Sequence, residues 1–118
     1  MDLADFRQIV LEIAALFERC YQHDQFYEDA LLQAATLPDE EFTEFLKSNE
    51  LWGGSGSLAD SGFEYDDAHP TLKRHRGELE ILMIQLGQRQ MTAGLVNVRT
   101  GMWVKALEKW RDAGIRNV

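Results

Sequence analysis

The sequence contains one cysteine, two prolines, no long apolar run and few basic residues in its first 70 positions. A single cysteine, Cys20, excludes a disulfide within the chain and agrees with a reducing compartment. The longest apolar runs are far too short to span a membrane, and the start MDLADF lacks the basic and then apolar pattern of a secretory signal. We therefore expect a cytoplasmic protein with no membrane contact.

The first 70 residues are rich in acidic side chains and poor in basic ones. Residues 1–70 carry sixteen acids and three bases, whereas residues 71–118 carry four acids and nine bases, so that −13 and +5 give the net charge of −8. Affinity for nucleic acid comes largely from basic side chains at phosphates, so this balance argues against a nucleic-acid partner. A basic protein partner fits better. The alternative is that the two halves face each other through surface ion pairs, each contributing well under about 1 kcal/mol.

Apolar residues recur at steps of three and four over most of the chain, which predicts helices. At 118 residues and 45% hydrophobic content, the chain suits one domain with a packed core. The sequence predicts an all-α, single-domain bundle of about five helices over residues 1–118, with an ordered Gly/Ser-rich loop between the third and fourth. The expected helices cover residues 3–21, 24–35, 38–48 and 70–93, followed by a last helix that Thr100 caps and Gly114 ends.

The first and last predicted helices carry the clearest apolar faces. In the first, Ile9 and Leu16 widen the stripe beyond a narrow seam, so we expect it to lie in the chain's own core. The alternative is a dimer seam on this helix, which would make the protein a homo-oligomeric structural module. In the last, Met102, Trp103 and Trp110 follow helical spacing and are expected to pack in the core rather than form a ligand cage.

The segment LWGGSGSLADSGF, residues 51–63, is the stretch that helix formation does not explain. Its glycines and serines would suit a flexible linker, but Trp52 and Phe63 are large apolar groups that should be buried. We expect an ordered loop, with Arg99 hydrogen-bonded to its carbonyl groups or paired with Glu50 or Asp60. The residues expected to stabilise this loop or to bind a ligand are Trp52, Gly53, Gly54, Ser55, Ser57, Asn97 and Arg99.

The sequence lacks the motifs that are typical of phosphate-binding, metal-binding and catalytic sites. The loop matches neither a P-loop nor a dinucleotide-binding pattern, and the acids after it would repel phosphate. Glu64, Asp66, Asp67 and His69 lack the spacing of calcium or zinc sites, so no metal or cofactor is expected. No Ser/His/Asp spacing is diagnostic of catalysis, and we expect a protein that is not an enzyme. The alternative is a small-ligand or enzymatic site at the loop, with Ser55, Ser57, His75 and Arg99 as its polar groups.

Three segments, ELWGGSGSLAD, ELEILMIQLG and NVRTGMW, resemble a family of small uncharacterised bacterial proteins with an LWGGSGS-type motif and a terminal MW helix. The resemblance covers about residues 45–110 and implies no catalytic residues. Small acidic single-domain proteins of this appearance are frequent among the immunity proteins of bacterial toxin systems.

These observations predict a non-enzymatic, acidic protein-binding module, in the manner of a bacterial immunity protein that occludes a basic toxin domain. Exposed acids would steer association, and a few aromatic side chains such as Tyr65 would supply affinity. The predicted partner-binding residues are Asp39, Glu40, Glu41, Glu44, Asp60, Glu64, Tyr65, Asp66 and Asp67.

Overall fold

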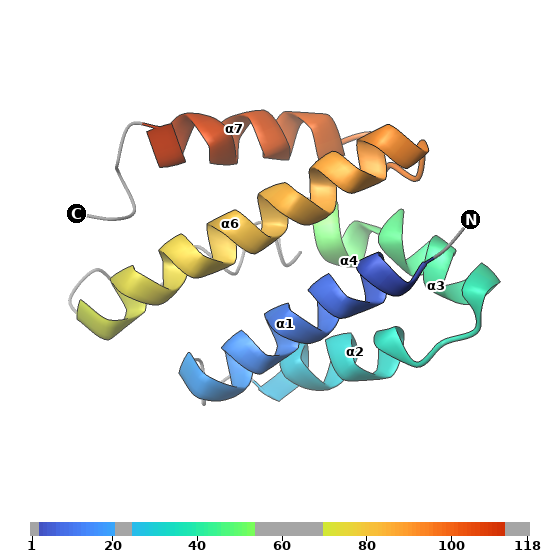
Figure 1. The fold of residues 1–118 in the computed structure, drawn as a ribbon, viewed down its shortest axis with the longest axis horizontal. Coiled ribbons are helices and arrows are strands. Elements are labelled where there is room, and N and C mark those ends of the chain that lie inside the picture. The colour runs from blue at the N-terminus through green and yellow to red at the C-terminus, as the bar shows by residue number, and fades with distance from the viewer. Residues whose placement is uncertain (1–2, 21–24, 54–69, 113–118) are drawn as a thin grey trace.

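The computed structural model of the protein describes residues 3–20, 25–53 and 70–112. These residues form helices and contain no strand, which confirms the all-α class (Figure 1). The helices are α1 (Ala4–Cys20), α2 (Gln25–Ala35), α3 (Asp39–Leu46), α4 (Asn49–Trp52), α6 (Pro70–Ala93) and α7 (Thr100–Asp112). All five predicted helices are present, and the ends that have described residues on both sides lie within about two residues of the expected ones. Gly114, expected to end the last helix, lies outside the described residues.

Helix α4 is the element that the sequence did not predict. Its last two residues, Leu51 and Trp52, were expected to begin the glycine loop, but the backbone N–H of Gly53 closes a helical turn by donating to the carbonyl of Asn49 at 3.0 Å. The turn forms because it buries Leu51 and Trp52, whose side chains are 1% and 0% exposed. The expected burial of Trp52 is therefore confirmed, while Phe63 and the loop from Gly54 onward lie outside the described residues.

The apolar stripe of α1 lies in the chain's own core, as predicted. The helix packs against α2 and α6, and the stripe is therefore not available as a dimer seam. Its buried residues are Phe6, Ile9, Val10, Ile13, Ala14, Leu16 and Phe17, with Leu3 just before the helix.

Helix α6 is the central helix of the bundle, with α1 on one side and α7 on another (Figure 1). Leu79, Met83 and Leu86 are fully buried, as their spacing predicts. Two polar residues, Glu80 and Gln90, are fully buried as well, which the sequence reading missed. Because α6 contacts neighbours on more than one side, its buried surface is wider than a single apolar stripe.

Helix α7 requires two corrections. Met102 was expected on the apolar face but is 58% exposed, whereas Val104 is buried and was not predicted. Trp103 and Trp110 are partly buried and pack against the core. Thr100 was expected to precede the helix as its cap, but it is the first helical residue, and its hydroxyl accepts the backbone N–H of Asn97 at 3.0 Å.

Arg7 joins three helices at one end of the bundle. Its guanidinium donates to the carbonyl of Ala35 and to the carboxylate of Asp39, both at 2.8 Å, and lies 4.4 Å above the ring of Phe42. These contacts hold α1 against the end of α2 and the start of α3. Arginine suits the position because its planar group can donate several hydrogen bonds and stack on an aromatic ring at once.

Candidate protein-binding surface

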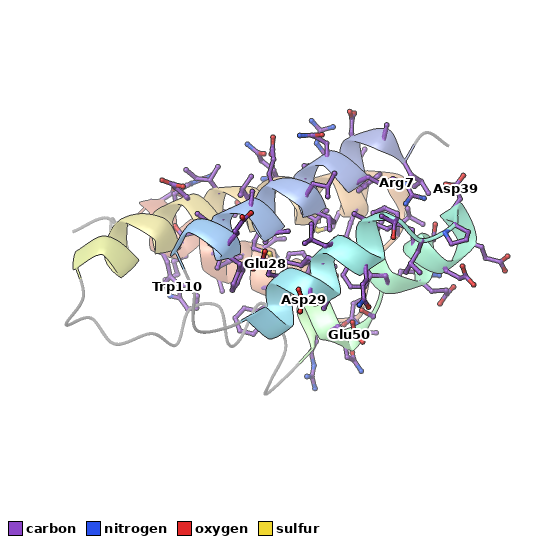
Figure 2. All side chains as sticks on the ribbon, turned by 90° about the horizontal axis from the view of Figure 1, so that it is seen from below. Arg7, Glu28, Asp29, Asp39, Glu50 and Trp110 are labelled. Carbon is purple, nitrogen blue, oxygen red and sulfur yellow. The ribbon has the colours of Figure 1, made fainter. Side chains whose placement is uncertain are left out.

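The helices α2, α3 and α4 carry an acidic surface. Residues 25–52 contain seven acidic side chains and one basic one, Lys47. Figure 2 shows Glu28 and Asp29 on α2, Glu50 on α4, and Asp39 beside Arg7. We use the name acidic surface for Glu28, Asp29, Asp39, Glu40, Glu41, Glu44 and Glu50, all exposed except the half-buried Glu28.

The four predicted acids of α3 are turned outward because the opposite face of this helix is buried. Phe42 and Leu46 are 0% exposed, and the acidic side chains occupy the remaining face. Three of the acids, Asp39, Glu40 and Glu41, lie in the first turn, where the helix dipole favours negative charge. The same side chains therefore stabilise α3 and give its surface a negative charge.

Of the four acids on α3, two form ion pairs within the described chain and two do not. Asp39 pairs with Arg7 at 2.8 Å, and Glu44 pairs with Lys47 at 3.2 Å. Glu40 and Glu41 are exposed and form no ion pair with any residue that the structure describes. Glu28, Asp29 and Glu50 form no such ion pair either, so five of the seven acids on this surface have no ion-pair partner within the described chain.

The remaining predicted partner-binding residues, Asp60, Glu64, Tyr65, Asp66 and Asp67, lie outside the described residues. Gly54, Ser55 and Ser57 of the proposed loop site do too. His75 lies in α6. Of the proposed loop site, the structure therefore describes Trp52, Gly53, Asn97 and Arg99.

Three of those four residues connect parts of the fold. The indole N–H of Trp52 donates to Gln90 Oε1 at 2.9 Å, and the carbonyl of Gly53 accepts the indole N–H of Trp103 at 3.2 Å. Asn97 Nδ2 donates to the carbonyl of Lys47 and to Asn49 Oδ1, at 3.0 and 2.9 Å. These bonds fasten the region around α4 to α6, α7 and the segment between them.

Of the partners expected for Arg99, the structure describes Glu50 and the start of the glycine loop, whereas Asp60 and the loop from Gly54 onward lie outside the described residues. The backbone N–H of Arg99 donates to Asn97 Oδ1 at 2.9 Å, which places it directly before α7. Arg99 is exposed and does not pair with Glu50, and its guanidinium makes no hydrogen bond or ion pair with the residues described here. Among the described residues, Asn97 links the segment before α7 to the start of α4.

Gln90 is the main residue that sequence reasoning missed. Its Nε2 donates to the carbonyl oxygens of Leu46 and Leu95, at 2.7 and 2.8 Å, while its Oε1 accepts from Trp52. One buried amide thus joins the end of α3, α4 and the segment after α6. Its spacing of four and seven residues from Leu86 and Met83 places it on the apolar face, a signal that could have identified it.

A shallow groove of about 430 Å³ lies between the start of α1 and the last turns of α6. It is lined by Asp5, Phe6, Gln88, Arg89, Thr92 and Ala93, and Arg89 pairs with Asp5 at 3.3 Å across it. Within the described ranges, no three potential metal-binding side chains come together. No helix among these residues is long and apolar enough to span a membrane.

Comparison of the sequence with protein-family models and with curated proteins, and of the fold with solved structures, finds no match. Function therefore has to be inferred from the surface itself.

Proposed function

We propose that this protein is a non-enzymatic binding module whose acidic surface contacts a basic protein partner, as an immunity protein that occludes a basic toxin domain. The proposal is carried by five exposed or half-exposed acids on α2–α4 that have no ion-pair partner within the described chain. The single base of this region, Lys47, already pairs with Glu44. The surface therefore presents a net negative charge that a basic partner would neutralise.

The contribution expected from these acids is kinetic. Exposed charges attract a partner of opposite sign over a distance of about 10 Å at 0.1 M salt, and they raise the rate of association more than the final affinity. Glu40 and Glu41 are the most informative pair, because they are adjacent and exposed and form no ion pair with a described residue. Asp39 is a poorer choice for a binding test, since replacing it also removes the contact with Arg7.

The alternative ligand site at the glycine loop has less support. Trp52 and Asn97 are already hydrogen-bonded within the fold, and Arg99 is exposed at the start of α7. The groove of about 430 Å³ lies at the opposite face of the last turns of α6, where Arg89 is engaged by Asp5. Neither place brings together a nucleophile and a base among the described side chains.

The test is affinity capture from the native cell lysate at low and moderate salt, followed by association kinetics with the captured partner. Glu40→Lys combined with Glu41→Lys should lower the association rate about tenfold at low salt and weaken its salt dependence. The matched control is Glu12→Lys with Glu18→Lys, which makes the same charge change at two exposed positions on α1. Melting curves of both variants show whether the fold is intact.

Two results would contradict the proposal. One is capture of no basic protein at either salt concentration. The other is an equal loss of association rate in the α3 and α1 variants, which would show that net charge matters and the acidic surface does not.

A further inference from the structure

Exposed apolar side chains gather where α6 turns into α7. Met91 is 41% exposed, Val96 40%, Val98 97% and Met102 58%, and we call these four residues the apolar corner. A Cβ atom added at Gly101 would lie 3.8 Å from the sulfur of Met91, so the end of α6 and the start of α7 meet here. Single exposed apolar residues are ordinary, but a cluster of them marks a surface that another molecule covers.

The backbone of the apolar corner is firmly held. Gly94 has a φ of +74°, and the N–H groups of Gly94 and Leu95 donate to the carbonyls of Met91 and Gln90, as in a Schellman motif. The Gln90 side chain binds the carbonyl of Leu95, and Asn97 fastens the segment to α4. A surface that is already ordered loses little conformational entropy when it binds.

Two opposite charges flank the apolar corner. Arg99 follows Val98 in sequence, and Glu50 follows Asn49, whose side chain accepts a hydrogen bond from Asn97. Both are exposed, and neither forms an ion pair with a residue that the structure describes. Across a two-fold axis, an apolar patch with a base and an acid at its edge presents the base of each copy to the acid of the other.

We propose that the apolar corner is the interface of a symmetric dimer of this chain. The corners of two copies pack against each other, and Arg99 of each copy pairs with Glu50 of the other. The patch is small compared with a standard interface of about 800 Å² per partner, so the dimer should be weak. This interface uses Glu50 of the acidic surface but leaves Glu28, Asp29, Glu40 and Glu41 free, and it does not depend on the proposed contact with a basic protein.

The experiment is sedimentation velocity of the purified protein from about 1 to 500 µM, a range chosen for a weak dimer. Val98→Glu should weaken the dimer about 30-fold or more, because each interface loses two apolar contacts and gains two buried charges. Since Val98 is 97% exposed, the fold should not change. The matched control is Leu11→Glu, which adds the same charge at a 39% exposed leucine on α1.

A charge swap tests the two-fold pairing directly. Arg99→Glu and Glu50→Arg should each weaken the dimer about fivefold, and the double variant should restore most of the loss, because the opposite charges then meet again. A chain that stays monomeric up to the highest concentration would overturn the proposal. So would a dimer that Val98→Glu leaves unchanged, or a double variant that is no tighter than its single variants.

Discussion

Gln90 shows how one buried polar side chain can organise a helical fold. Its amide satisfies the carbonyls of Leu46 and Leu95 and the indole N–H of Trp52, all of which lie in segments where helices end. Carbonyl groups at helix ends have no partner within the helix and need one from elsewhere when they are buried. Glutamine fits because it provides donors and an acceptor on the same short planar group.

Replacing Gln90 should therefore destabilise the protein far more than replacing a neighbouring glutamine. Gln90→Leu keeps the approximate volume but leaves a buried N–H and two carbonyls without this partner, at a cost of about 3 kcal/mol in the free energy of unfolding. Gln88→Leu is the matched control. Gln88 is exposed on the same helix, with one side-chain bond to Glu108 at 3.2 Å, and its replacement should cost under about 0.5 kcal/mol.

Urea denaturation followed by tryptophan fluorescence measures both variants, and the indole of Trp52 should report directly on the lost bond. Equal unfolding free energies for Gln90→Leu and Gln88→Leu would show that the network contributes little to stability.

Helix boundaries were predictable because the residues that start and stop helices are local signals. Pro70 and Gly94 bound α6, and Pro38 precedes α3. Helix α4 was missed because four residues are too few to show a period, and it forms through the burial of Leu51 and Trp52. Helical spacing also failed to separate Met102 from Val104, since which face of α7 is buried depends on how it crosses α6.

Gly87 lies where α6 packs closely against α4 and α7. A Cβ atom added there would lie 2.3 Å from Val104 Cγ2 on α7 and 3.2 Å from Cη2 of the Trp52 ring. The absence of a side chain at Gly87 therefore allows α6 to approach α4 and α7 closely. The neighbours are side chains of α4 and α7 and not another backbone.

Gly87→Ala should lower the free energy of unfolding by about 1 to 3 kcal/mol, because the added methyl group overlaps a side chain that cannot swing away. Alanine would otherwise favour a helix by about 1 kcal/mol. Gly101→Ala is the control, since the added methyl meets nothing nearer than 3.8 Å and should not destabilise α7. Adding Val104→Ala to Gly87→Ala should recover part of the loss, and no recovery in thermal melts would rule out this overlap.

At the scale of the whole molecule, the stable core belongs to α1 and α6. These two helices pack on each other and hold most of the fully buried side chains, whereas α3 and α4 contribute two each. Apolar periodicity predicted which face of each long helix is buried, but it did not predict that α1 and α6 hold the larger share of the core. It could not predict that Arg7 meets Asp39, 32 positions away, or that Arg99 does not pair with Glu50, since these depend on where helices meet.

Hydrogen exchange should show the same division. The amides of Ile9–Phe17 in α1 and Leu79–Leu86 in α6 should exchange most slowly, with the free energy of global unfolding. Amides of α3 and α4 should exchange faster, because these short helices can open without separating α1 from α6. Native-state exchange measured by NMR over a range of low denaturant concentrations tests this order. If α4 were protected as strongly as α6, the network around Gln90 would belong to the same cooperative unit.

The start of α1 and the end of α7 lie at opposite ends of the molecule. Asp5 at the start of α1 pairs with Arg89 close to the α6–α7 turn, whereas α7 runs from that turn to the other end of the molecule (Figure 1). Thirteen helical residues extend about 20 Å. A fluorophore placed on the last turn of α7 is thus farther from the α6–α7 turn, which carries Met91 and Val98, than one placed on the first turn of α1 (Figure 1).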